Sequence, residues 1–276
     1  QRACRRLSSS SSASAPALAR LKDVLGRQPA SLQSDAVIDY LRKSKLARSE
    51  LDASDIEIIA DLVASNPNVE SIDVSSNGFG AKGAAALGRM VQSCASLRHL
   101  ASGRNNLRTG VAELAATIAD NTTLQRLELP ANAVNAATCA AVGASLRSNS
   151  GLLEFDLSWN PFGPGGGEGM AALLGANTTL QRLNLAGCAI RAEGTCAVAA
   201  ALEAAPGSAL RELDLSENFV GREGALALAA LLARTPRLEV LLLGGNGPLD
   251  REGCAALAAG VAANSSLRVL GMQSNG

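Results

Sequence analysis

Few residues of this chain could combine for acid–base or nucleophilic chemistry. The only histidine is His99, so any histidine-dependent catalytic triad would need it. The repeat described below places His99 at a solvent-facing strand position, and the other exposed positions of that strand carry no acid. We therefore interpret His99 as a surface histidine and predict no catalytic triad.

The cysteines predict no metal site. No two of them are separated by two residues, which is a common spacing of zinc ligands. Most fall at expected helix or turn positions, as reduced packing residues do in an intracellular protein. The six are Cys4, Cys94, Cys139, Cys188, Cys196 and Cys254. We predict no metal and no cofactor.

A glycine cluster follows an expected strand and precedes an expected helix, where a phosphate-binding loop would lie. Its members are Gly163, Gly165, Gly166, Gly167 and Gly169. The Lys-Ser/Thr pair of a phosphate loop is missing, and most neighbouring units have a glycine at the same place. We interpret the cluster as a structural turn and predict no small-molecule substrate.

Charged residues recur at intervals near 28 residues or its multiples. They are Asp73, Glu128, Asp156 and Asp214, with Arg126 and Arg182 in a parallel series. Such recurrence predicts an acidic lane with arginines alongside, and ordinary solvated surface is the alternative interpretation. Trp159, the only tryptophan, falls at the rim of this surface. An exposed tryptophan is a favoured anchor of protein interfaces, so we predict that these seven residues bind a protein partner.

The interval comes from a repeat that matches the leucine-rich pattern L-x-x-L-x-L-x-x-N/C-x-L. Its units begin at Val69, Leu97, Leu124, Leu152, Leu180, Leu210, Leu238 and Leu267. We number positions within each unit from this first residue, which is position 0. Position 8 reads Asn77, Asn105, Asn132, Asn160, Cys188, Asn218, Asn246 and Asn275. An apolar pair four residues apart follows in every full unit, such as Leu228 and Leu232, and indicates one helix per unit.

One unit cannot bury its own apolar faces, so the copies must stack. The fold class predicted is an α/β leucine-rich repeat solenoid, a right-handed βα horseshoe. Its parallel sheet lies on the concave side and its helices on the convex side. Positions 3 and 5 of each unit face the core, and positions 2 and 4 face solvent. The long period resembles that of the ribonuclease-inhibitor-like class of leucine-rich repeats.

The chain divides into three parts. Residues 1–15 are basic and serine-rich and predict a low-complexity linker, or alternatively the remnant of an organelle transit peptide. Residues 16–40 predict a helical N-terminal cap. Residues 41–276 hold the repeats, with a degenerate first repeat at 41–68 and a truncated last one from 267.

Composition excludes other classes of partner. The net charge is zero and aromatic residues make up 2% of the chain, so neither a basic surface nor stacking platforms for nucleic acid are expected. No apolar run approaches the roughly 18–20 residues of a membrane span. We expect a cytoplasmic protein, or organelle import if residues 1–15 are a transit-peptide remnant.

One unit carries a closer resemblance. The stretch Ala101–Leu107, ASGRNNL, is similar to the G-R-N-x-L stretch of Ran GTPase-activating proteins, and the general texture also resembles NOD-like receptor repeats. The resemblance implies that Asn105, with Arg104 beside it, orients the catalytic glutamine of a Ran-like small GTPase. Our main hypothesis is a non-catalytic scaffold that binds a protein partner on its concave face. GTPase activation is the alternative.

Overall fold

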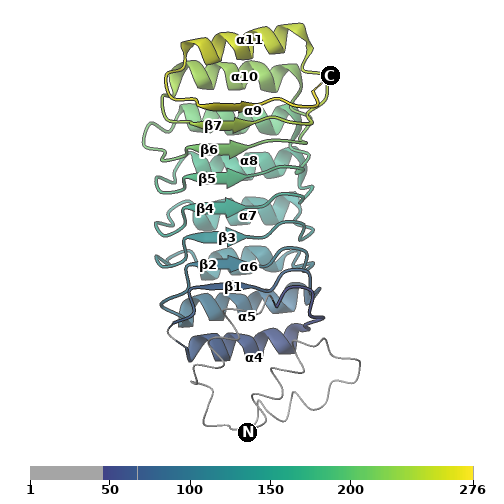
Figure 1. The fold of residues 1–276 in the computed structure, drawn as a ribbon, viewed down its shortest axis with the longest axis vertical. Helices are drawn as coiled ribbons and strands as arrows, with labels where there is room; N and C mark the ends of the chain where they lie inside the picture. Colours follow the sequence, from purple (N-terminus) through teal and green to yellow (C-terminus); the bar gives the residue numbers. More distant parts are fainter. Residues whose placement is uncertain (1–45, 67, 276) are drawn as a thin grey trace.

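A computed structural model describes residues 46–66 and 68–275 of the chain. Figure 1 shows strands and helices alternating along one axis, with each helix behind the sheet. The strands are β1 (Ser71–Asp73), β2 (His99–Ala101), β3 (Arg126–Glu128), β4 (Glu154–Asp156), β5 (Arg182–Asn184), β6 (Glu212–Asp214), β7 (Val240–Leu242) and β8 (Val269–Gly271). The helices are α4 (Ala53–Ala64), α5 (Gly80–Ser93), α6 (Gly110–Thr117), α7 (Ala136–Leu146), α8 (Gly163–Leu174), α9 (Arg191–Glu203), α10 (Gly221–Arg234) and α11 (Asp250–Ala263).

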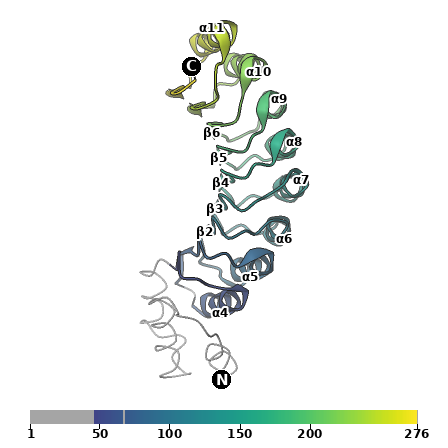
Figure 2. The ribbon, with the colours of Figure 1, turned by 90° about the vertical axis from the view of Figure 1, so that its right-hand side faces the viewer.

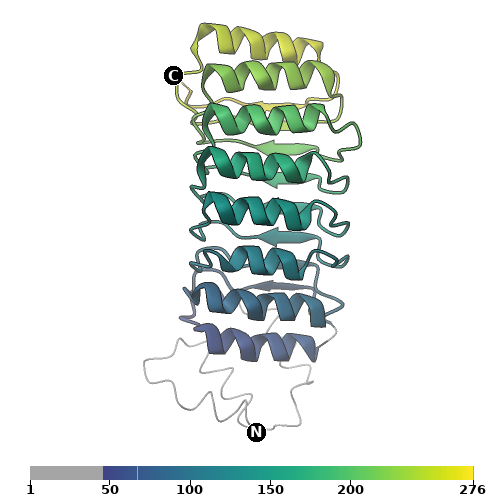
Figure 3. The ribbon, with the colours of Figure 1, turned by 180° about the vertical axis from the view of Figure 1, so that it is seen from behind.

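The sheet is parallel throughout, and its strand order follows the chain from β1 to β8. Figure 2 shows a gently curved stack with the strands on the inner side, and Figure 3 shows the row of helices from behind. Strands pack about 4.8 Å apart and helices about 8–10 Å apart, and this mismatch bends the stack. The predicted α/β solenoid is therefore confirmed.

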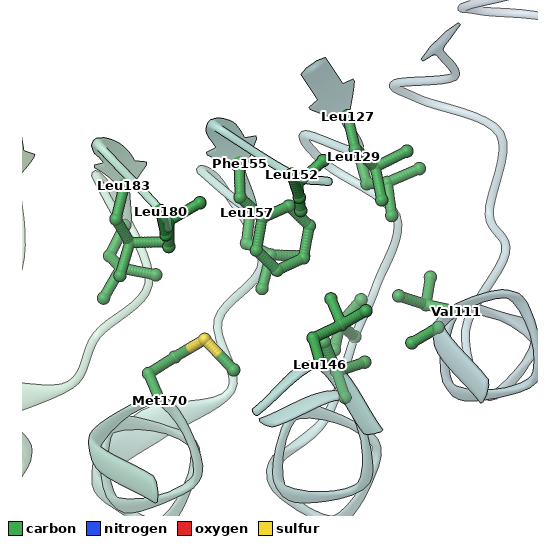
Figure 4. Close-up of a cluster of buried hydrophobic side chains, with 14 of the residues drawn as sticks. Val111, Leu127, Leu129, Leu146, Leu152, Phe155, Leu157, Met170, Leu180 and Leu183 are labelled. Atoms are coloured by element: carbon green, nitrogen blue, oxygen red, sulfur yellow. The ribbon is translucent and has the colours of Figure 1, made fainter. Parts of the chain in front are cut away.

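Position 3 of the repeat forms one buried row. Residues paired in the sheet run Ile72, Leu100, Leu127, Phe155, Leu183, Leu213, Leu241 and Leu270. All but Leu270 are at most 2% exposed. Figure 4 shows Phe155 and Leu157 of one strand unit pointing at Met170 and Leu146 of the helices behind. The core is thus one continuous layer between sheet and helices, as the repeat pattern predicted.

The asparagines at position 8 join each repeat to the one before it. The Asn132 side-chain oxygen accepts the backbone N–H groups of Asn105 at 3.0 Å and Leu107 at 3.3 Å. Its amide donates to the Ser102 carbonyl at 2.9 Å. Equivalent bonds are made by Asn77, Asn105, Asn160, Asn218 and Asn246. Because these turns are buried from water, the side chains satisfy backbone groups that would otherwise be costly.

A second asparagine series stabilises the turns that lead into the strands. Asn149 accepts the N–H groups of Gly151 and Leu152 at 3.1 and 2.8 Å and donates to the Ile118 carbonyl at 3.0 Å. Asn121, Asn177 and Asn264 make corresponding bonds. All four stand three residues before the first residue of a unit, a regularity that the sequence analysis did not use.

The N-terminal cap and the segment 1–15, with Cys4, lie outside the described residues, as does the start of the degenerate first repeat. Within the described part of that repeat, Leu46 and Leu51 are buried. The backbone N–H of Ser49 donates to the Asn77 side chain at 2.8 Å, as its place in the repeat requires.

The interpretation of the glycine cluster as a turn was only partly right. Gly163 has the positive φ of a turn residue, +70°, but α8 begins there and contains the other glycines. A side chain at Gly167 would lie 2.7 Å from the Gly194 Cα, and one at Gly169 equally close to the Ala140 Cα. These glycines therefore permit the close approach of α8 to its two neighbouring helices.

Candidate functional site: the charged concave face

The exposed face of the sheet is dominated by charged side chains on its middle strands. We call the side chains at positions 2 and 4 of β3 to β6 the concave strip. Its members are Arg126, Glu128, Glu154, Asp156, Arg182, Asn184, Glu212 and Asp214. They line a shallow hollow of about 220 Å³. This volume is below the roughly 300–1,000 Å³ of typical small-molecule pockets.

Position 2 forms a ladder of alternating charge. Arg126 Nε lies 2.5 Å from Glu128 and 3.4 Å from Glu154. Arg182 lies 2.7 Å from Glu154 through Nη1 and 3.1 Å from Glu212 through Nε. Each arginine is therefore held between two carboxylates. Of the predicted acidic lane only Glu128 pairs with one of them, and the other partners are the position-2 glutamates Glu154 and Glu212.

The carboxylates at position 4 have a structural duty that the sequence analysis missed. Asp156 accepts the backbone N–H of Ser158 at 2.8 Å, and Asp214 accepts that of Ser216 at the same distance. Asp73 and Asn184 cap the N–H two residues on in the same way. These are Asx turns, for which short acidic or amide side chains are required. Glu128 can be longer because Pro130, two residues on, has no N–H to cap.

Two carboxylates of the concave strip have shifted pKa values. Burial raises the pKa of Asp156, with a further contribution from the nearby charge of Glu128, while hydrogen bonds from Ser158 and Asn184 oppose the rise. The pKa of Glu128 is lowered, chiefly by its hydrogen bond to His99; burial opposes this change, and the charges of Arg126 and His99 lower the pKa further. Glu128 is therefore the better-stabilised anion of the two.

His99 belongs to a polar line across three strands. Its Nδ1 lies 2.9 Å from the Ser71 hydroxyl, and its Nε2 lies 3.2 Å from Glu128. The prediction of a surface histidine missed this contact because the acid comes from a neighbouring strand. The line resembles a hydrolase triad in residue types only. The backbone N–H of His99 donates to the Glu70 carbonyl just before β1, and neither Ser71 nor His99 lines the hollow of the concave strip.

Trp159 lies in the turn that follows β4 and is 59% exposed. Its ring covers Gly187 of the next repeat: a Cβ added there would lie 2.7 Å from Cε3 of the indole. Gly187 thus provides a flat support for one side of the ring. The same arrangement recurs two repeats on, where the Glu217 side chain covers Gly245.

Asn105 and Arg104 occupy very different places. Asn105 is 0% exposed, and its oxygen accepts the N–H groups of Asn77 and Gly78 at 2.8 and 2.9 Å. Its amide donates to the Val74 carbonyl and the Ser102 hydroxyl, both at 2.9 Å. Arg104 is exposed in the turn, with φ +55°. The structure therefore uses the whole side chain of Asn105 to join two repeats.

The described part of the chain contains no cluster of histidine, cysteine and carboxylate side chains that could hold a metal ion. Among the described helices, none is long and apolar enough to cross a membrane.

Cys188 fills the position-8 place of its unit, with its sulfur 3.3 Å from the Leu157 carbonyl, and burial raises its pKa to about 12.

Comparison with known proteins agrees with the fold and the repeat. A family model described as Leucine Rich repeat matches residues 65–88, 148–171, 176–197 and 209–229. Ribonuclease inhibitors of Mus musculus and Sus scrofa are each 29% identical to the chain over 68% and 70% of its length. The chain thus carries leucine-rich repeats and is similar in sequence to these ribonuclease inhibitors.

Coverage limits what these relatives imply. The chain spans about half the length of the two inhibitors, 48% and 49%. The solved structure of the leucine-rich repeat-containing protein LegL7 from Legionella pneumophila is 19% identical, with a TM-score of 0.53, and covers 85% of this chain and 86% of its own. That similarity concerns the fold alone. Leucine-rich repeat proteins are generally protein-interaction scaffolds, and those similar to ribonuclease inhibitors are typically non-catalytic.

Proposed function

We propose that the chain binds a protein partner through the concave strip, with Trp159 as an anchor and without catalysing a reaction. The observation that carries the proposal is the placement of Trp159. A 59% exposed indole supported on one side by Gly187 contributes little to folding and offers a rigid apolar surface. Such side chains supply a large share of the binding energy in protein interfaces.

The charge of the concave strip defines the chemistry of the partner. It holds five carboxylates against two arginines, and both arginines are shared among the glutamates. Asp156 and Asp214 are hydrogen-bonded to neutral groups instead. The surface is therefore net acidic, and it favours a partner that presents lysine or arginine side chains, because complementary charge raises association rates and specificity.

The relatives support a protein partner in general. Two of them are named ribonuclease inhibitors, so by name they act on another protein. The GTPase-activating alternative is not favoured by any contact. Asn105, its central residue, is buried and fully hydrogen-bonded, so it could reach a GTPase only if the turn opened.

A matched pair of glycine variants tests the role of Trp159. Gly187→Ala places a methyl group against the indole, whereas Gly245→Ala places one against the Glu217 side chain. The two glycines have φ values of +66° and +69°, so the backbone cost of the two substitutions should be alike. The partner is first identified by affinity capture and then purified and titrated against each variant.

We expect Gly187→Ala and Trp159→Ala to weaken binding of the purified partner at least fivefold, about 1 kcal/mol. Gly245→Ala should not weaken it, and Trp159→Ala should leave the melting temperature nearly unchanged. Equal loss of affinity in both glycine variants would show that general destabilisation is responsible. Unfolding of Trp159→Ala would make Trp159 a packing residue and remove the basis of the proposal.

A further inference from the structure

A second hollow, of opposite charge, lies where β6, β7 and β8 begin. Its volume is about 500 Å³, and its charged lining consists of Arg211, Arg237, Glu239 and Arg268. Pro236 and Ser265 are among the other lining residues. Three arginines surround a single carboxylate, so the hollow carries a net charge of +2.

Glu239 organises two of the arginines. Arg211, Glu239 and Arg268 are neighbours on successive chain segments, since the Glu239 N–H donates to the Arg211 carbonyl and the Arg268 N–H to the Glu239 carbonyl, both at 2.8 Å. Arg211 Nη1 lies 2.6 Å from one Glu239 oxygen, and Arg268 Nε lies 3.7 Å from the other. The arginine side chains are 64% and 78% exposed, so most of their N–H donors face solvent.

Arg237 approaches from the preceding turn. Its Nη1 donates to the backbone carbonyl of Ser208 at 2.9 Å, which positions the guanidinium without neutralising its charge. No carboxylate of the described residues is paired with it by an ion-pair contact. Its place beside Pro236, which has a fixed φ, limits the movement of this segment.

The arginine cluster is confined to one end of the face. Arg211 and Arg268 stand at position 1 of their units. In the middle units position 1 holds Gln125, Leu153 and Gln181, so no basic stripe runs along the molecule. The concave strip, by contrast, is net acidic. In the concave strip carboxylates outnumber the arginines that pair with them. In the arginine hollow the single carboxylate, Glu239, contacts two of three arginines.

We propose that this hollow binds a phosphate monoester through Arg211, Arg237 and Arg268. A guanidinium is a planar fork of N–H donors that matches phosphate oxygens in pairs. The doubly charged phosphate balances the net +2 of the hollow, whereas a single carboxylate would leave one arginine uncompensated. The inference is independent of the partner proposed for the concave strip.

The test uses the full chain and two defined probes, inorganic phosphate and N-acetyl-phosphoserine amide, with N-acetyl-serine amide as the uncharged control. Affinities are measured by calorimetric titration for the wild type and for Arg237→Gln, Arg268→Gln and Arg98→Gln. Arg98 is the matched control, because it has the position of Arg211 in its own repeat and likewise donates to a backbone carbonyl, that of Thr123 at 3.3 Å. All three side chains are exposed, so the variants should fold.

We expect about tenfold weaker binding of the phosphate probes in each of the two cluster variants and no change in Arg98→Gln. Tighter binding of the phosphoserine probe than of inorganic phosphate supports a monoester on a polypeptide chain, whereas equal affinity for the two would overturn the choice of a monoester and leave a site for phosphate alone. Lowering the pH from 7.5 to 5.5 should weaken phosphate binding, since the second pKa of a phosphate monoester is about 6. Sulfate, which stays doubly charged, should bind equally at both pH values.

Three further results would overturn the proposal. Binding of the unphosphorylated control as tightly as the phosphoserine probe would show that the phosphate group is not recognised. An equal loss in Arg98→Gln would mean that general surface charge attracts the probes. If the wild-type protein is folded by circular dichroism and binds neither phosphate probe, the site is excluded.

Discussion

Replacement of Asn105 by alanine should destabilise the protein. Asn105 is buried, although its neighbours Arg104 and Asn106 in the same turn are exposed. The substitution removes four hydrogen bonds, two accepted from Asn77 and Gly78 and two donated to Val74 and Ser102. At about 0.5–1.5 kcal/mol each the loss is about 2–6 kcal/mol, and we expect about 3 kcal/mol because some of the freed groups will find water.

The assay is urea denaturation followed by circular dichroism, with the free energy of unfolding extrapolated to zero urea. Asn106→Gly is the control, because Asn106 is the exposed next residue and its φ of +57° suits glycine. It should change stability by less than about 0.5 kcal/mol. Asn105→Cys should restore part of the loss, since Cys188 fills the equivalent place with its sulfur near the Leu157 carbonyl.

A loss below about 0.5 kcal/mol in Asn105→Ala would refute the structural role. If that variant instead stayed stable and lost stimulation of GTP hydrolysis by a Ran-like GTPase, the activator alternative would be restored. A fall in stability means that lost activity in this variant cannot by itself assign a catalytic role to Asn105.

Other variants test the core, the thiols and the charges. Leu213→Ala should cost about 2–5 kcal/mol in denaturation, because Leu213 is 0% exposed in the central row. At pH 8 a thiol reagent should modify the exposed Cys254 and spare Cys188 until the protein unfolds, since the Cys188 pKa is raised to about 12. Asp156→Asn should keep the Asx turn and slightly stabilise the protein at pH 7, and the gain should vanish on acidification, because a raised pKa means that the charged form opposes folding. Glu128→Gln should have the opposite effect, a small destabilisation present above the unfolded pKa of about 4.3 and lost as the pH falls through the lowered folded pKa. Melting curves at several pH values check both signs.

The repeat allowed the core to be predicted well. Positions 3 and 5 and the helix pairs follow from the apolar spacing, apart from the polar Ser102 at position 5, and nearly all are buried as expected, with Val261 half-buried in the last helix. The position-8 asparagines also turned inward, because a buried turn leaves backbone N–H groups that only such a side chain can satisfy.

The contacts across strands were harder to predict. The link from His99 to Glu128 joins position 2 of one unit to position 4 of the next, so a search within one strand could not find it. The Asx role of Asp156 and Asp214 did leave a signal, since the one long acid in the series, Glu128, precedes Pro130. The second asparagine series also left a signal in the sequence, because its members stand three residues before the first residue of a unit. They are Asn121, Asn149, Asn177 and Asn264.

These structural duties change which residues carry functional weight. Asp156 and Asp214 cap turns, so their presence is explained by folding alone and gives weak evidence for a partner. Trp159 has no such duty, since it is mostly exposed and a smaller residue, Ala131, holds the same left-handed turn position in the preceding unit. The surplus arginines around Glu239 likewise satisfy no need of the fold beyond single carbonyl or carboxylate contacts. Binding on this solenoid is therefore best sought at the tryptophan and at the arginine cluster, and the acidic turn caps between them set the charge of the surface that a partner meets.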